Sequence, residues 1–272
     1  MPPCVMRHDI TVTIAVFVAV AFAVGVVGYV AVSFRLMRAH VAGRSKTAAL
    51  REALREVFWA SVSQPLVPLF YAVGRRMGSG TGDVPVVCVH GYMQNRVDFV
   101  ALARQLERTG AGAIYGFNYP WFDTVEKNAA RLSRFVEGVR REQGVERVDI
   151  VAHSLGGIVA MRMLRDGGDK VVRKCVTIAS PHAGVAWRGP ILGACGPHLR
   201  AASAIVIERA EEQVSIPCLS VYSTHDNVVH PPESSSLVKR GGSDLVLGGV
   251  GHLSILFSRE AMGAVSGFLR AT

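Results

Sequence analysis

Residues 148–157, VDIVAHSLGG, decide the fold of this chain. The apolar run 148–151 predicts a buried strand, and the sequence after Ser154 predicts a helix, so this serine lies in the turn between them. Ala152 and Gly156, two residues to either side, are small, as a tight strand-to-helix turn requires. Such a turn exposes the hydroxyl and points a helix N-terminus at it, where backbone N–H groups can hold an oxyanion. By itself the pattern is equally compatible with an ordinary turn.

The alternation of short apolar runs and amphipathic segments continues on both sides of this turn. The clearest helical pattern is 124–143, whose apolar residues form one stripe. Continuous apolar strands separated by helices are typical of a mainly parallel sheet covered on both faces. We therefore expect an α/β domain over residues 83–272 with a sheet of about six strands. The expected strands are 84–89, 113–117, 148–151, 171–179, 216–222 and 244–247.

Two further strand ends carry the residues that a serine nucleophile needs. Asp226 follows the apolar run 216–222, and His252 follows the run 244–247. Because the carboxyl ends of parallel strands meet at one edge of a sheet, we expect both side chains near Ser154. Alone, such an aspartate or histidine is usually a turn residue. The chain order Ser, Asp, His favours a catalytic triad in which His252 is the general base and Asp226 orients it.

The end of the first expected strand, VHGY at 89–92, completes this site. An apolar-His-Gly turn supplies one oxyanion N–H, here that of Tyr92, beside the N–H of Leu155. We expect His90 to stabilise the turn and His153 to be structural.

From about residue 84 to residue 269, the chain resembles the α/β-hydrolase superfamily and is most similar to small bacterial lipases and esterases of the triacylglycerol-lipase type. Alanine in the first small position of the turn, as at Ala152, occurs in that lipase group. The resemblance covers the whole predicted domain in order. It rests on the motifs VCVHGYMQN, VAHSLGG, TIASPHAG, YSTHDNVV and GVGH.

The resemblance also implies how substrate is held. The loop TIASPHAG resembles the one that lines the acyl pocket in this family, although its histidine, His182, fits the catalytic order less well than His252. Residues 182–215 leave room for a small cap only. No acidic cluster for calcium is evident, and we expect no metal or cofactor. Three apolar cap residues are expected to contact substrate: Trp187, Ile191 and Leu192.

The N-terminal region differs from this domain in composition. Residues 1–80 hold nine Lys or Arg against three Asp or Glu, which is most of the net charge of +9. The 25 residues 10–34 carry no charge and are long enough to span a bilayer. We expect residues 1–46 to form an uncleaved single-pass anchor with a basic flank, placed by the resemblance in a bacterial inner membrane. A cleaved signal peptide is the main alternative and a buried core helix a lesser one.

Residues 47–82 are expected to form an amphipathic and linker region that ends in the flexible boundary GSGTG at 78–82. The basic residues after the apolar segment favour a cytoplasmic catalytic domain by the positive-inside rule. Because the N-terminal tail is short, the side of the membrane that carries the domain stays open. The five cysteines form no disulfide framework by number, and three of them lie in apolar strand-like runs.

These patterns predict a membrane-tethered serine hydrolase that cleaves carboxylic esters, with lipid or acyl esters as substrates. An acyltransferase or a thioesterase using the same triad is an alternative, and a non-catalytic membrane scaffold is another. Residues 81–272 hold 21 Lys or Arg against 18 Asp or Glu, which removes the case for nucleic acid as a partner. The oligomeric state is left open.

Overall fold

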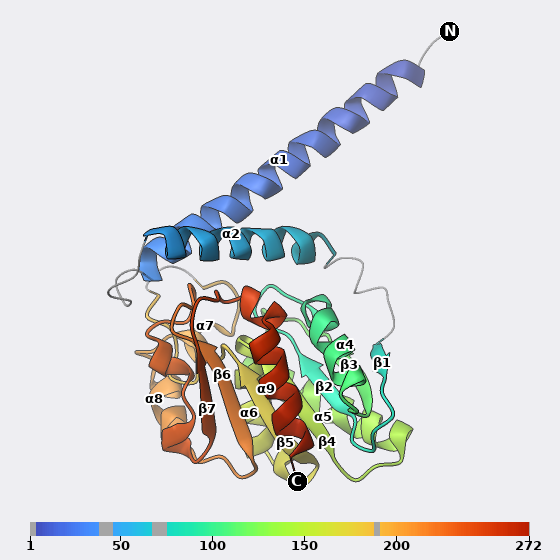
Figure 1. Ribbon diagram of the computed structural model, residues 1–272, viewed down its shortest axis with the longest axis vertical. Coiled ribbons are helices and arrows are strands. Elements are labelled where there is room, and N and C mark those ends of the chain that lie inside the picture. Colours follow the sequence, from blue (N-terminus) through green and yellow to red (C-terminus); the bar gives the residue numbers. More distant parts are fainter. Residues whose placement is uncertain (1–3, 38–45, 67–74, 188–190, 272) are drawn as a thin grey trace.

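A seven-stranded sheet forms the centre of the computed structural model, which describes residues 4–37, 46–66, 75–187 and 191–271 (Figure 1). Its strand order is β1-β3-β2-β4-β5-β6-β7, with β1 antiparallel to β3 and all other neighbours parallel. The strands are β1 (Arg76–Ser79), β2 (Val86–Val89), β3 (Ala113–Phe117), β4 (Val148–His153), β5 (Val172–Ile178), β6 (Cys218–Ser223) and β7 (Ser243–Leu247).

The six expected strands are present, and β1 is an additional one. It comes from residues 76–79, which overlap the stretch expected to be a flexible boundary. The pattern missed it because β1 lies at the edge of the sheet, where its residues are exposed or half-buried and need no apolar run. The sheet therefore begins before residue 83.

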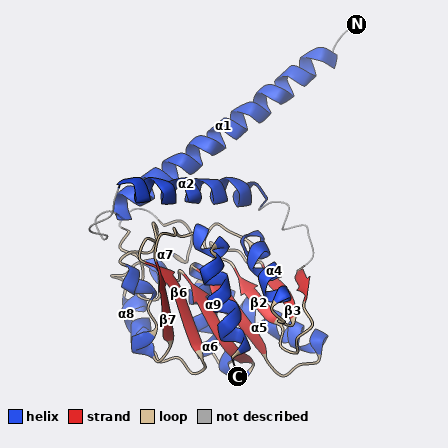
Figure 2. Ribbon diagram, in the orientation of Figure 1, coloured by secondary structure: helices blue, strands red, loops and turns tan. Residues whose placement is uncertain are grey.

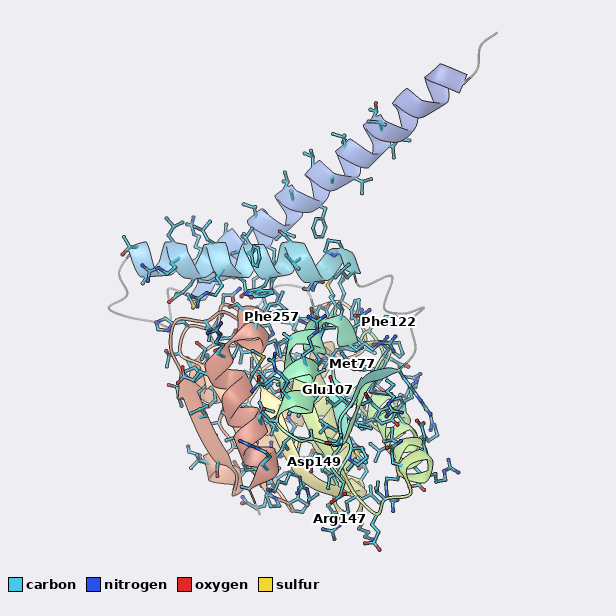
Figure 3. The ribbon with its side chains drawn as sticks, turned by 45° about the vertical axis from the view of Figure 1, so that its right-hand side comes forward. Met77, Glu107, Phe122, Arg147, Asp149 and Phe257 are labelled. Atoms are coloured by element: carbon cyan, nitrogen blue, oxygen red, sulfur yellow. The ribbon has the colours of Figure 1, made fainter. Side chains whose placement is uncertain are left out.

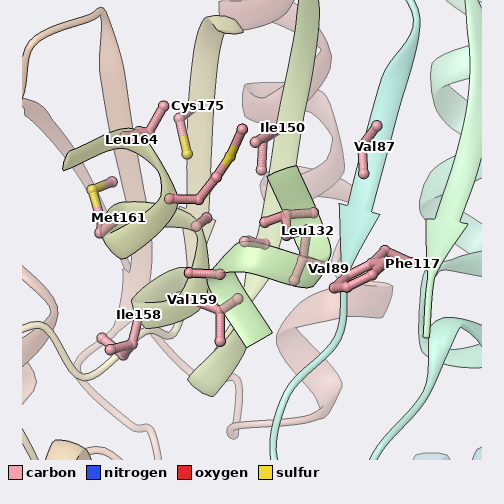
Figure 4. Close-up of a cluster of buried hydrophobic side chains, with 14 of the residues drawn as sticks. Val87, Val89, Phe117, Leu132, Ile150, Ile158, Val159, Met161, Leu164 and Cys175 are labelled. Atoms are coloured by element: carbon pink, nitrogen blue, oxygen red, sulfur yellow. The ribbon is translucent and has the colours of Figure 1, made fainter. Parts of the chain in front are cut away.

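Helices cover both faces of the sheet, as the continuous apolar strands predicted (Figure 2). One buried cluster joins α5 (Val125–Gln143) and α6 (Leu155–Arg165) to β2, β3 and β4, and Figure 4 shows part of it. The other joins α4 (Val100–Arg108) and α9 (Arg259–Arg270) to the opposite face. The expected helix 124–143 is α5, whose N-cap, Thr124, accepts a hydrogen bond from Lys127 N and whose C-cap is Gly144 at φ 66°.

Apart from α4, α5 and α6, the described connections between strands are short helices and turns. Between β5 and β6 the described cap holds only α7 (Gly196–Leu199) and α8 (Ala204–Ala210). The 3₁₀ helices are Gln64–Leu66, Arg96–Phe99, Gly168–Lys170, Pro232–Ser235, Val238–Arg240 and Ser254–Phe257.

Two N-terminal helices lie against the end of the sheet at which the predicted catalytic residues stand. Helix α1 (Cys4–Met37) extends away from the domain, and α2 (Lys46–Ser63) lies across it (Figure 1). The stretch Val12–Met37 is long and apolar enough to span a membrane, a property that a signal sequence shares. On α2, Trp59 stacks on Phe257 with ring centroids 3.8 Å apart, and Figure 3 shows Phe257 beneath this helix.

Candidate active site

Ser154 occupies a strained turn between β4 and α6. Strand β4 ends at His153 and α6 begins at Leu155, and Ser154 between them has φ 52° and ψ −124°. A Cβ atom at Gly156 would overlap the carbonyl oxygen of Val89 in β2, so the turn can pass this close to the sheet only with glycine there. A non-glycine residue at positive φ is strained, and such strain is often held at functional sites.

The structure brings Ser154, His252 and Asp226 into one hydrogen-bonded series. The Ser154 Oγ lies 3.0 Å from His252 Nε2, and His252 Nδ1 lies 2.9 Å from Asp226 Oδ2. The other carboxylate oxygen of Asp226 accepts hydrogen bonds of 2.8 Å from the backbone N–H groups of Val228 and Val229. With both oxygens engaged, the carboxylate is fixed in orientation, and so is the imidazole tautomer it holds.

The charges around His252 favour its protonated form. Burial by itself lowers the pKa of His252, but the Asp226 carboxylate, by charge and hydrogen bond, and the Glu56 carboxylate more than offset this, so the pKa is raised. A base whose charged form is stabilised is suited to accept the proton of a serine hydroxyl.

The backbone of His252 is also held on both sides. Its N–H donates to Asn227 Oδ1 at 2.9 Å, and its carbonyl oxygen lies 3.0 Å from His153 Nε2. His153 is fully buried, and burial lowers its pKa well below the usual value, so it stays neutral and acts as a structural partner. The contact of Asn227 with His252 was not predicted, because only its position directly after Asp226 distinguishes Asn227 in the sequence.

Of the two expected oxyanion donors, Leu155 directly follows Ser154 in the chain, and Tyr92 lines the same cavities as Ser154. Leu155 is the first residue of α6, so its N–H has no acceptor within the helix. Tyr92 lies in the turn after β2 and lines both cavities that reach Ser154. His90 stabilises this turn, since its Nε2 accepts from Tyr119 N at 3.2 Å and its carbonyl oxygen accepts from the Tyr119 hydroxyl at 2.6 Å.

An apolar cavity of about 460 Å³ opens at Ser154, within the size range of small-molecule sites. Trp187 and Ile191 line it, as expected of the cap. Leu192 does not: its side chain is 64% exposed, and its backbone N–H and carbonyl oxygen each lie 3.0 Å from the Tyr92 hydroxyl. His182 is buried away from this site, with its Nε2 3.0 Å from Thr177 Oγ1.

Within the described ranges, no group of three or more His, Cys, Asp or Glu side chains is placed to hold a metal ion. The functional groups gathered around Ser154 are those of acid–base and nucleophilic chemistry.

The fold is identified by its sheet topology and by the turn at Ser154. Ser154, Asp226 and His252 follow β4, β6 and β7 in that order along the chain. The chain has the α/β-hydrolase fold. Residues 86–213 match the alpha/beta hydrolase family.

Solved structures with the same fold include lipases. A lipase B of Aspergillus fumigatus superposes with a TM-score of 0.59 at 19% identity, over 67% of this chain and 51% of the other, so this chain spans about half of its length. The mature form of a Bacillus licheniformis lipase gives 0.58 at 16% identity over 71% and 94% of the two chains. A monoacylglycerol lipase of Paleococcus ferrophilus gives 0.54 at 18% identity over 71% and 97%. At such identities, the likeness concerns the fold alone.

Proposed function

We propose that this protein is a membrane-tethered serine hydrolase that cleaves carboxylic esters of apolar acids. The observation that carries the proposal is the hydrogen-bonded series from Ser154 Oγ through His252 to Asp226, with an apolar cavity beginning at the same hydroxyl. Similarity in fold to structures described as lipases supports the reaction class by analogy.

The reaction proceeds through an acyl-enzyme. Ser154 Oγ attacks the carbonyl carbon of the ester while His252 Nε2 takes the hydroxyl proton, and the N–H groups of Tyr92 and Leu155 stabilise the oxyanion. Collapse of this intermediate breaks the ester C–O bond, and His252 gives its proton to the departing alcohol. A water molecule, deprotonated by His252, then attacks the acyl carbon. The bond from the acyl carbon to Ser154 Oγ breaks, His252 returns the proton to Ser154 Oγ, and the acid leaves.

Helix α1 tethers the enzyme to a membrane in this proposal. Its length and apolar composition over Val12–Met37 support a span, and the exposed side chains along most of this stretch would face lipid. A tether raises the local concentration of lipid-soluble esters. Extraction of membranes with alkaline carbonate tests it: a spanning helix keeps the full chain in the membrane pellet, whereas a cleaved leader would yield a shortened, soluble product.

The activity is tested with the detergent-solubilised full chain. We expect it to hydrolyse p-nitrophenyl esters and to be labelled at Ser154 by a fluorophosphonate, and Ser154→Ala should lose several orders of magnitude in rate and all labelling. Absence of turnover and labelling in well-folded wild-type protein would refute the proposal and favour a scaffold. Addition of a competing alcohol distinguishes hydrolysis from acyl transfer, because transfer yields a new ester.

A further inference from the structure

Two cavities, rather than one, meet at Ser154, and α1 forms a wall of both. The first, of about 460 Å³, runs along the C-terminal part of the helix. The second, of about 450 Å³, runs along an earlier part of the helix and beneath α2. Tyr29 borders both. From α1, the first is lined by Gly28, Tyr29, Val32, Ser33 and Leu36, and the second by Phe22, Gly25, Val26 and Tyr29.

The C-terminal part of α1 is fastened to the catalytic domain. Asn227 Nδ2 donates a hydrogen bond of 2.8 Å to Ser33 Oγ, and both groups are buried. Val30, Phe34 and Met37 on the same helix are buried and pack against α2. Because these contacts hold the helix beside Ser154, its cavity-lining residues have defined positions relative to the nucleophile.

The lining chemistry favours hydrocarbon. The described residues that line the first cavity include no Asp, Glu, Lys or Arg. The charged residue of the second is Glu56, an acid, and no Lys or Arg is among the described residues around it. A phosphate group would require cationic partners or backbone donors to offset its desolvation, so the lining fits uncharged arms.

We propose that α1 is part of the substrate-binding site, and that the two cavities hold the two arms of an uncharged ester, acyl on one side of Tyr29 and alcohol on the other. The inference rests on the proposed function and specifies its substrate class: an ester with a hydrocarbon arm on each side of the carbonyl, drawn from the bilayer along α1. A membrane helix then acts as a specificity element as well as a tether.

Two glycines of α1 provide a direct test. Gly28 lines the first cavity and Gly25 the second, and a Cβ atom built at either has no other group within 4 Å. A side chain at either position therefore starts in open space at the cavity wall, and a leucine adds volume there. Ala23 is exposed on the same helix and lines neither cavity, so Ala23→Leu is the matched control.

The experiment uses the full chain in phosphatidylcholine vesicles and two substrate series. One varies the acyl arm, from p-nitrophenyl acetate to palmitate, and the other varies the alcohol arm among acetate esters. We expect Gly28→Leu to lower the long-to-short ratio of kcat/KM about tenfold in one series, and Gly25→Leu to do so in the other. Ala23→Leu should keep the wild-type ratios.

The outcomes separate the inference from the proposed function. Wild-type turnover with unchanged ratios in both glycine variants, or with both variants affecting the same series, would overturn the inference and leave the hydrolase intact. Hydrolysis of vesicle phosphatidylcholine in preference to neutral esters would also overturn it. A wild-type chain that neither turns over short esters nor takes the fluorophosphonate label would refute the proposed function and the inference with it.

A different observation concerns Glu56 of α2, which is 1% exposed. Its Oε1 accepts a hydrogen bond of 2.6 Å from Leu253 N, and its Oε2 accepts one of 2.9 Å from Ser254 N. A Cβ at Gly251 would lie 2.6 Å from Oε2, so the carboxylate also packs against the residue that precedes His252. The buried Glu56 side chain thus contacts the loop before His252 by packing and after His252 by hydrogen bonds.

We infer that Glu56 is a positioning residue that holds His252 in line between Ser154 and Asp226. Burial raises the pKa of Glu56 itself, whereas the hydrogen bonds from Leu253 N and Ser254 N and the charge of His252 lower it in part. In its ionised form, the Glu56 carboxylate contributes to raising the pKa of His252. Among the described residues, the charged or titratable groups that face His252 are Asp226 after β6, His153 at the end of β4 and Glu56 on α2. Tyr29 on α1 and Tyr92 after β2 border the same cavity.

Glu56→Gln and Glu56→Asp test this role on a short, soluble ester, with rates divided by the number of sites that a fluorophosphonate titrates. We expect Glu56→Gln to lower kcat about tenfold with little change in KM, and to move the acid limb of kcat/KM to lower pH. Glu56→Asp should restore part of kcat and return the acid limb toward that of the wild type. A merely structural role would reduce the number of titrated sites while leaving kcat per site and the acid limb unchanged, and that result would overturn the inference.

Discussion

Asp98 is a buried acid whose replacement should stabilise the protein in a pH-dependent way. It lies in the 3₁₀ helix Arg96–Phe99 and is fully buried. Burial raises its pKa from 3.8 to about 7, and the Ser63 hydroxyl of α2 lowers it only in part. Asp98→Asn keeps the size of the side chain and removes the ionisation.

The change in folding stability with pH follows from the different pKa of Asp98 in the folded and the unfolded chain. The unfolded chain loses this proton near pH 4, whereas the folded protein keeps it until about pH 7, so folded stability falls as pH rises through this window. Each pKa unit corresponds to about 1.4 kcal/mol, so the penalty is about 1.5 kcal/mol at pH 5 and about 4 kcal/mol at pH 8. Because asparagine cannot ionise, the variant should gain about 2.5 kcal/mol more at pH 8 than at pH 5, or about 5–10 °C in Tm.

Thermal unfolding of the full chain in a neutral detergent, followed by far-UV circular dichroism at pH 5 and pH 8, measures this difference. Asp83→Asn, at an exposed position, controls for the loss of one negative charge. A gain in Tm from Asp98→Asn that is equal at the two pH values, or larger at pH 5, would refute the assignment of a buried carboxyl with a raised pKa.

Three other expectations concern the active site and its support. Asp226→Asn should lower kcat by about three to four orders of magnitude on a soluble ester, because the amide cannot stabilise the protonated imidazole; retention of rate in a folded variant would contradict it. In the wild type, a pH profile of kcat/KM should show an acid limb whose midpoint lies above 6.5, the ordinary pKa of histidine, because the pKa of His252 is raised. Gly157→Ala should destabilise the protein by about 2 kcal/mol or more, because its Cβ would overlap Ser180 Oγ, whereas Gly263→Ala meets open space and should be neutral or stabilising; denaturant unfolding compares the two.

The sheet and the positions of Ser154, Asp226 and His252 were predictable because each follows from a local pattern combined with one global rule. An apolar run marks each strand, and parallel topology brings the strand ends together. Ser154 carries the further signal of small neighbours, which the close approach of Gly156 to Val89 explains. Such inferences require no knowledge of side-chain contacts.

The contributions of the N-terminal helices were not predictable in this way. Ser33 lies near the end of the apolar segment 10–34 and Glu56 lies in an amphipathic one, so neither differs in pattern from a lipid-facing serine or a solvated acid. Their partners, Asn227 and the loop at Leu253, are about 200 residues away in sequence. Only packing in three dimensions gives these residues their roles. The same holds for β1, whose place is fixed by pairing with β3.

The two halves of the triad differ in what supports them. Ser154 is held by the sheet itself, because its N–H bonds to Ile178 O in β5 and its turn packs against β2. The loops that carry Asp226 and His252 are tied instead to the N-terminal helices: Asn227 bridges His252 N to Ser33 of α1, and Glu56 of α2 binds the loop after His252. The hydrogen bonds from α1 and α2 therefore reach the loops of Asp226 and His252, whereas Ser154 is held by hydrogen bonding to the sheet. In the proposed function, an apolar ester between α1 and the domain would contact the elements that hold His252, so binding of substrate and alignment of the proposed base would be physically coupled.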